Sequence, residues 1–134
     1  MYIHKVQYYE TDKMGITHHS NYIRFMEEAR TDFLEKLGYG YDRMEREGVI
    51  SPVTSVSCDF KKSTTYADEI SIDVRVCELS AVRISLLYEM KRGEDTVCNG
   101  KSSHCFLNVA GKIISLKREL PDFYAKMQEI LIKE

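Results

Sequence analysis

Residues 21–37 read NYIRFMEEARTDFLEKL, and this stretch decides the fold. Apolar side chains recur in it at intervals of three and four residues, the period of one face of an α-helix. The pattern predicts a helix from about Asn21 to Leu37, which Gly38 can stop. Either Ser20 or Asn21 can cap the helix by accepting hydrogen bonds from the free amides of its first turn. The apolar positions are Ile23, Met26, Ala29, Phe33, Leu34 and Leu37.

Tyr22 and Phe25 add apolar surface outside that stripe, so the helix is apolar over a wider arc than an ordinary surface helix. Other parts of the chain must therefore cover it on several sides. The remaining sequence indicates what covers it.

The segments beyond the helix read mainly as strands. In residues 69–76, EISIDVRV, isoleucines and valines alternate with polar side chains, which is typical of a sheet with one buried face. Residues 2–10, 51–62, 81–92 and 96–109 are also predicted strands, and 92–94 and 110–112 look like tight connections. Residues 41–48 suggest a short helix and 121–132 a C-terminal helix that begins with a proline. This order predicts an α+β fold.

Composition excludes several classes of protein. The 134 residues suffice for one domain, here taken as 1–134, and 19 basic against 21 acidic residues, mixed along the chain, argue against nucleic acid as a partner. Four cysteines without a CxxC pair and no recognisable signal peptide predict reduced thiols in a cytoplasmic protein. No apolar stretch approaches the roughly 20 residues of a membrane span.

The chemistry-bearing residues gather in residues 8–22, YYETDKMGITHHSNY. His18 and His19 are neighbours whose side chains should diverge, and no ligand spacing supports a metal site. Ser20 lacks the GxSxG surroundings of a catalytic serine. Asp12 leaves the first strand just before a helix start, where unpaired amides and about half a positive charge can hold an oxyanion. The alternatives are that Asp12 caps its own turn and that His19 is an exposed loop residue.

The segment DKMGITHHSNY resembles the D-x-x-G-[IV]-x-x-x-x-N-Y signature of the hot-dog-fold 4-hydroxybenzoyl-CoA thioesterase family. It looks especially like the small bacterial acyl-CoA thioesterases in which a histidine precedes the helix. The similarity continues in FMEEART and in SVSCDFKKSTTYADEISIDVRV, and so covers nearly the whole chain. The resemblance implies an antiparallel five- or six-stranded sheet wrapped around a long central helix, with a C-terminal helix.

The resemblance also implies the parts of an active site. Asp12 matches the catalytic carboxylate, which would attack the thioester carbonyl as a nucleophile or activate water as a general base. His19 matches the second catalytic position, whose backbone N–H polarises the thioester oxygen. Asn21 and Tyr22 match positions that shape and brace the site, with capping and packing as their alternative roles. Ser63 and Thr64 belong to a loop that borders the site across a subunit interface.

Two pairs of charged residues also stand out. Glu27 and Arg30 match an E-x-x-R in the family's helix, and a structural ion pair is the favoured interpretation over catalysis. Lys61 and Lys62 could contact the phosphates of coenzyme A, although exposed lysines are common on any surface.

The expected function is hydrolysis of an acyl or aromatic acyl thioester to the free acid and coenzyme A. Coenzyme A belongs to the substrate, so no cofactor and no metal are expected. The expected assembly is a homodimer or homotetramer with shared sites. An acyl-acyl carrier protein thioesterase and a non-catalytic acyl-CoA-binding hot-dog module are the alternatives.

Overall fold

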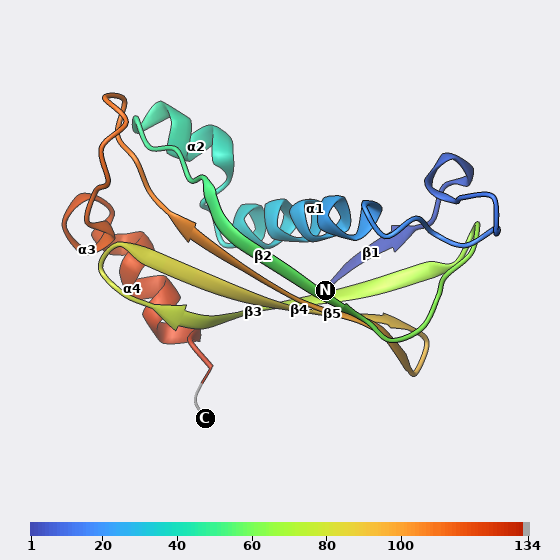
Figure 1. Ribbon diagram of the computed structural model, residues 1–134. Helices are drawn as coiled ribbons and strands as arrows, with labels where there is room; N and C mark the ends of the chain where they lie inside the picture. The colour runs from blue at the N-terminus through green and yellow to red at the C-terminus, as the bar shows by residue number, and fades with distance from the viewer. Residues whose placement is uncertain (133–134) are drawn as a thin grey trace.

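The computed structural model describes residues 1–132 and shows one antiparallel sheet with a long helix lying across it (Figure 1). The long helix is α1, Asn21–Lys36, within one residue of its predicted end. The other elements, in chain order, are β1 (Tyr2–Lys5), the short 3₁₀ helix η1 (Tyr8–Glu10), α2 (Tyr41–Arg46), β2 (Val53–Phe60), β3 (Glu69–Leu79), β4 (Arg83–Arg92), β5 (Asp95–Cys105), α3 (Leu116–Glu119) and α4 (Pro121–Ile130).

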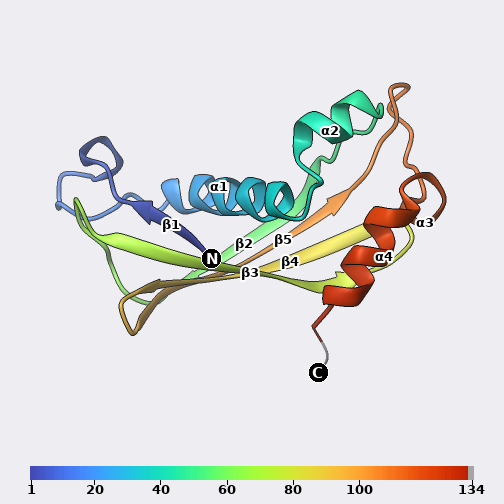
Figure 2. The same ribbon diagram turned by 180° about the vertical axis from the view of Figure 1, so that it is seen from behind.

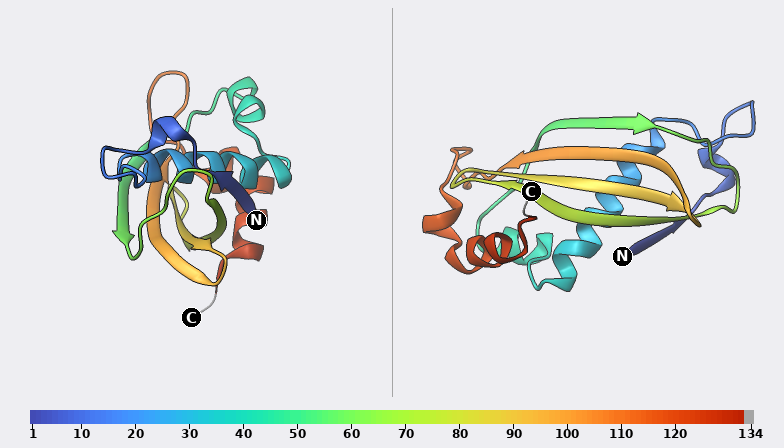
Figure 3. Two further views of the ribbon diagram at one scale, coloured as in Figure 1. Left: turned by 90° about the vertical axis from the view of Figure 1, so that its right-hand side faces the viewer. Right: turned by 90° about the horizontal axis from the view of Figure 1, so that it is seen from below.

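The sheet has the strand order β1-β3-β4-β5-β2, and every neighbouring pair is antiparallel. In the end-on view of Figure 3 (left), the sheet curves beneath α1, with β2 and β1 at its two edges. Figure 2 shows α2, α3 and α4 at one end of the sheet, and the loops that follow β1 and β2 at the other. The predicted α+β fold with a wrapped central helix and a C-terminal helix is confirmed, with five strands.

The apolar faces of α1 and β3 pack against each other, which explains why the sheet lies against the helix. Tyr22, Phe25 and Met26 of α1 are buried, as are Ile70 and Ile72 of β3. Packing of these residues removes from water the wide apolar arc of α1. Each such side chain contributes about 1.5–3 kcal/mol to the free energy of folding when it is fully buried.

The predicted apolar stripe of α1 was wrong at Ile23. Its side chain is 50% exposed, whereas Tyr22 and Phe25, which the stripe omitted, are buried. The buried face is therefore turned slightly around the helix axis.

The first strand is shorter than predicted. β1 ends at Lys5, and the chain then turns as η1 instead of staying extended to Glu10. The Glu10 carboxylate explains the turn, because it accepts the Gln7 N–H at 2.7 Å and lies 2.9 Å from Nε2 of His4. These contacts require the chain to fold back on itself.

The predicted cap of α1 was also wrong. Ser20 has helical backbone angles and no side-chain capping bond, because its hydroxyl contacts Nδ1 of His18 at 2.8 Å. The side chain of Asn21 donates rather than accepts. The first amides of the helix instead bond the preceding main chain, from Asn21 to the His18 carbonyl and from Tyr22 to the His19 carbonyl.

A polar network crosses the core beneath α1. Arg30 is almost fully buried and donates to the hydroxyls of Tyr41 at 2.8 Å and Tyr88 at 3.1 Å. The Tyr88 hydroxyl contacts that of Ser102, which lies 2.7 Å from Nε2 of His104. Arg30 therefore has no ion pair with Glu27 among the described residues, and that prediction was wrong because Arg30 points into the core.

His104 should make folding stability sensitive to acid. Burial, and then the charge of Arg30, lower the pKa of His104 from 6.5 to about 4, and its Nδ1 has no partner among the described residues. As the pH falls from 6.5 towards 4, the unfolded chain takes up a proton here and the folded protein does not. The free energy of unfolding should fall in this window, by at most about 1.4 kcal/mol per pH unit from this group.

We expect His104→Gln to flatten this part of the pH dependence, even if it lowers stability at neutral pH. Urea unfolding at closely spaced pH values gives the free energy of unfolding, and its slope against pH is the quantity to compare. His18→Gln is the matched control for the loss of a histidine, because His18 is exposed and lies outside the network of Arg30 and His104; it should keep the pH dependence that His104 causes. An identical slope in wild type and His104→Gln would show that another group is responsible.

Candidate functional site

A pocket of about 340 Å³ lies beside the start of α1. Four of the six predicted site residues line it, namely Asp12, His19, Tyr22 and Ser63. Residues 1–132 hold no group of three or more metal-ligating side chains placed to share an ion, and no described helix is long and apolar enough to cross a bilayer.

Two distant segments of chain meet to form this pocket. Ile16 and Thr65 form an isolated antiparallel bridge, and the Thr17 amide donates to the Thr64 carbonyl at 2.8 Å. The loop after β1 is thereby fixed beside the loop after β2. This contact brings Ser63 to the same hollow as Asp12.

Asp12 caps its own turn, the structural alternative for this residue, and its side chain also lines the pocket. Its Oδ1 accepts the Met14 N–H at 2.8 Å and so caps the turn, and Gly15, with φ of 79°, closes that turn by donating to the Asp12 carbonyl. Glycine adopts such a positive φ without strain because it has no Cβ. Oδ2 has no hydrogen-bond partner among the described residues, and the side chain lines the pocket. The turn engages one carboxylate oxygen and leaves the other without a partner among the described residues.

The amide of His19 is the second chemical feature. The N–H groups of the neighbouring residues all have acceptors: His18 bonds the Glu10 carbonyl, Ser20 bonds Nδ1 of His18, and Asn21 bonds the His18 carbonyl. No acceptor for the His19 N–H occurs among the described residues. This donor stands at the positive end of a 16-residue helix, where negative charge is stabilised.

The rings around the pocket form an aromatic wall. Phe60 packs edge-on against Tyr22 at 5.2 Å between ring centres and lies 6.3 Å from the His19 ring. The expectation that the two histidine side chains diverge was wrong, because the turn before α1 stacks the rings of His18 and His19 at 4.2 Å.

Tyr22 faces the pocket with its ring and the protein interior with its hydroxyl. The hydroxyl contacts Oγ1 of Thr64 at 2.9 Å, and Thr64 contacts Oγ1 of Thr17 at 2.6 Å. Burial raises the pKa of Tyr22, so the phenol stays neutral. Thr64 is completely buried, and the structure therefore places it behind the pocket wall rather than in it.

Asn21 also lies outside the pocket lining. Its Nδ2 donates to the Glu10 carbonyl at 2.9 Å and to the His18 carbonyl at 3.3 Å. Asn21 thus ties the start of α1 to η1, which fits the bracing role better than contact with substrate.

Basic side chains border the pocket mouth. Lys61 and Lys62 both line it, and Lys62 pairs with Asp95 at 2.9 Å on the exposed surface. Arg92 donates to the Ser63 carbonyl at 2.6 Å and fixes that loop. Lys61 has no ion-pair partner among the described residues, and its positive charge would favour an anionic ligand.

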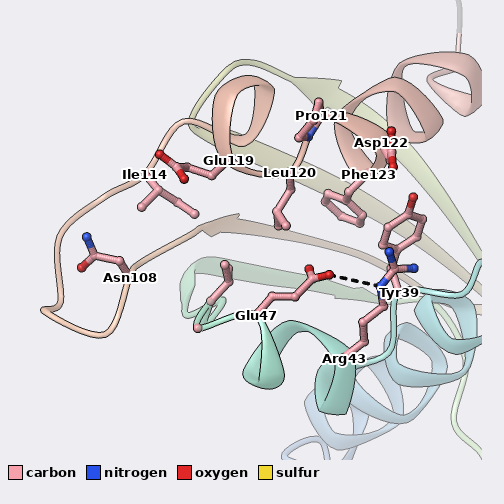
Figure 4. Close-up of a pocket in the computed structure, with 12 residues that line it drawn as sticks. Tyr39, Arg43, Glu47, Asn108, Ile114, Glu119, Leu120, Pro121, Asp122 and Phe123 are labelled. Atoms are coloured by element: carbon pink, nitrogen blue, oxygen red, sulfur yellow. Dashed lines mark ion pairs between the residues drawn. The ribbon is translucent and has the colours of Figure 1, made fainter.

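A second pocket of about 340 Å³ lies between α2 and α4 at the other end of the molecule (Figure 4). Arg43 points into it, but this cation is occupied by Glu47, by the Gly38 carbonyl and by the ring of Tyr39. None of the predicted site residues lies there, and the pocket of Asp12 is therefore the candidate site.

Sequence reasoning missed two contributors to the site. Phe60 was placed only within a predicted strand, although its position at the strand end next to the lysines could have suggested a pocket wall. Glu10 was taken as the end of a strand, and an isolated glutamate in an aromatic segment gives no signal that it will be buried.

Comparison with known proteins identifies the family of this chain. Residues 6–131 match the model of the thioesterase-like superfamily. The chain is 35% identical over 120 residues to an Aquifex aeolicus protein provisionally named an esterase, covering 90% of this chain and 93% of that protein. It is 25% identical over 100 residues to the acyl-CoA thioesterase YbgC of Haemophilus influenzae, covering 74% and 72%.

The fold agrees as well. The crystal structure of a DHNA-CoA thioesterase from Staphylococcus aureus superposes with a TM-score of 0.89 at 34% identity, covering 96% of this chain and 89% of that one. The resemblance to hot-dog thioesterases seen in the sequence is confirmed. This chain therefore belongs to the thioesterase-like superfamily, the class of enzyme that its sequence predicted.

Proposed function

We propose that the protein hydrolyses an acyl-CoA thioester at the pocket of Asp12. One observation carries the proposal: a carboxylate oxygen and a backbone N–H, both without partners among the described residues, belong to residues that line one pocket. Hydrolysis of an acyl group needs a nucleophile or base and a donor for the developing oxyanion.

The proposed reaction starts with the thioester oxygen bound to the His19 N–H. Asp12 either takes a proton from water as the water attacks the carbonyl carbon, or attacks that carbon itself to form an anhydride that water then hydrolyses. The C–S bond breaks, and the products are the carboxylic acid and coenzyme A. Because the pKa of a thiol is about 8.5, the thiolate can leave without a general acid.

The coenzyme A part of the proposal rests on charge and on the relatives. Relatives from Haemophilus influenzae and Staphylococcus aureus are named for acyl-CoA and DHNA-CoA thioesters. Lys61 and Lys62 border the mouth of this pocket, where they would meet phosphate groups.

A panel of acyl-CoAs with short, long and aromatic acyl groups tests the proposal, with thiol release as the measurement. We expect turnover of at least one member. The same acyl chain on an acyl carrier protein tests the closest alternative, and a preference for that carrier would exclude a coenzyme A enzyme. Saturable binding without turnover across the panel would favour a non-catalytic acyl-CoA binder.

We also propose that two copies join at β2. This strand forms one edge of the sheet over eight residues, and three of its apolar side chains, Val53, Val56 and Phe60, are 42–51% exposed. An edge of this length with apolar side chains is a template for pairing with another strand. Phe60 also lines the pocket, so the partner would lie next to the site. The mass of the protein in solution tests the proposal, and a stable monomer would contradict it.

A further inference from the structure

A buried cluster of ionisable side chains, linked to the loop that carries His19, joins η1, β1 and α1. The side chain of Glu10 is 1% exposed and that of His4 is 9% exposed, with Nε2 of His4 2.9 Å from Oε1 of Glu10. The other ring nitrogen of His4 lies 3.1 Å from Oε1 of Glu28, which also accepts the Tyr2 hydroxyl at 2.6 Å. Both ring nitrogens of His4 thus contact carboxyl oxygens, one from η1 and one from α1.

A buried cluster of ionisable groups is often no more stabilising than the same volume of apolar side chains. Removing two charges from water carries a penalty that their attraction often fails to repay, so a buried pair by itself is weak evidence of a stabilising role. The His4 ring already packs against Phe25 at 4.0 Å between ring centres, where an apolar side chain would fit well. The pair therefore calls for an explanation other than stability.

The main chain of Glu10 gives a reason for the buried pair other than stability. Its carbonyl accepts two hydrogen bonds, from the His18 N–H at 2.8 Å and from Nδ2 of Asn21 at 2.9 Å. These donors lie on either side of His19 in the sequence. The Glu10 carbonyl thus holds both ends of the short segment whose central amide faces no acceptor among the described residues.

The carboxylate of the same residue fixes where that carbonyl lies. Through Oε1 it binds the Gln7 N–H at 2.7 Å as well as His4, and so it closes η1 and anchors the turn to β1. Side chain and main chain of Glu10 together form a connection from β1 to the start of α1.

We propose that Glu10 is a positioning residue: its buried carboxylate, held by His4, sets the main-chain carbonyl that orients the His19 amide towards the thioester oxygen. This inference rests on the proposed function for its catalytic consequence. Its structural part, that the Glu10 carboxylate holds the 18–21 segment, stands independently of any activity.

Glu10→Gln and Glu28→Gln form a matched pair for the test. The amide introduced by Glu10→Gln can still accept the Gln7 N–H but lacks the charge that holds His4, whereas Glu28 contacts the same imidazole from α1 and has no bond to the 18–21 segment. Since misplacement of a catalytic group by about 1 Å can cost roughly 100-fold, we expect kcat of Glu10→Gln to fall about 10- to 100-fold. KM should stay within about twofold, and Glu28→Gln should keep wild-type kcat.

Asn21→Asp gives the second variant. It removes the amide donor and places a negative charge near the Glu10 carbonyl, so kcat should fall with KM nearly unchanged, as in Glu10→Gln. Thermal unfolding identifies any variant that is not folded at the assay temperature. A wild-type kcat in Glu10→Gln, or an equal loss in Glu28→Gln, would overturn the inference.

Amide hydrogen exchange tests the structural part without substrate. We expect the His18 amide to exchange at least about tenfold faster in Glu10→Gln than in wild type, and Glu28→Gln to match wild type, because only the first variant loosens the acceptor. Equal protection of His18 in all three proteins would overturn the inference. If wild type hydrolyses no member of the acyl-CoA panel, the proposed function fails, and the exchange result still decides the structural part.

Discussion

Asp12→Asn should lower kcat/KM for the preferred thioester by about 100- to 10,000-fold, the range that a general base or nucleophile contributes. The substitution is almost isosteric, and an asparagine Oδ1 can still accept the Met14 N–H that holds the turn at 2.8 Å. The pocket should therefore keep its shape and lose only the charge. The measurement is steady-state hydrolysis with free-thiol detection, together with binding of an unreactive substrate analogue.

Asp73→Asn is the control for Asp12→Asn. Asp73 is a strand residue that pairs with Arg75 at 2.8 Å on the exposed side of β3, and it does not line the pocket. We expect it to keep wild-type kinetics. Undiminished turnover in Asp12→Asn would refute the assigned role of Asp12. If the variant binds the analogue more weakly but keeps the wild-type kcat, Asp12 is a binding residue instead.

Replacing the His19 amide by an ester should lower kcat by about 100- to 1,000-fold, the usual cost of removing one oxyanion donor. An ester keeps the side chain and the backbone shape but has no N–H. Residues 1–57 can be synthesised and joined to the rest of the chain at Cys58, which provides a native ligation junction. The fully amide protein made by the same route is the control.

His19→Ala separates the side chain from the main chain. It keeps the N–H, and so a smaller loss of kcat than in the ester protein would assign the oxyanion contact to the backbone. If the alanine variant lost as much as the ester protein, the imidazole would matter as much as the backbone N–H, and the contact could not be assigned to the backbone alone.

Much of the fold could be predicted because its signals are local. The period of residues 21–37 predicted α1 to within one residue, and the alternation in residues 69–76 identified the buried face of β3, where Ile70 and Ile72 are fully buried. The errors arose where tertiary contacts decide the conformation. Glu10 turns the chain through contacts with His4 and Gln7, and no periodic pattern in the sequence reports them.

The site was predictable in part for the same reason. Asp12 and His19 flank one turn, so their proximity follows from chain distance, and the family resemblance added Ser63 from a distant loop. The pocket contains all three. Thr64 is buried behind the pocket wall by its contacts with Thr17 and Tyr22, and the sequence did not show which residue of this loop would point inward. The single domain, the cytoplasmic location and the absence of a cofactor stay predictions.

The two edges of the sheet differ in a way that bears on assembly. β2 offers eight residues at one edge, whereas β1 at the other has only four, followed closely by η1. A two-fold axis that joins β2 to its own copy would use up the long edge of both subunits. Only the short edges would then remain at the outside of the combined sheet, and growth into filaments would stop at two copies.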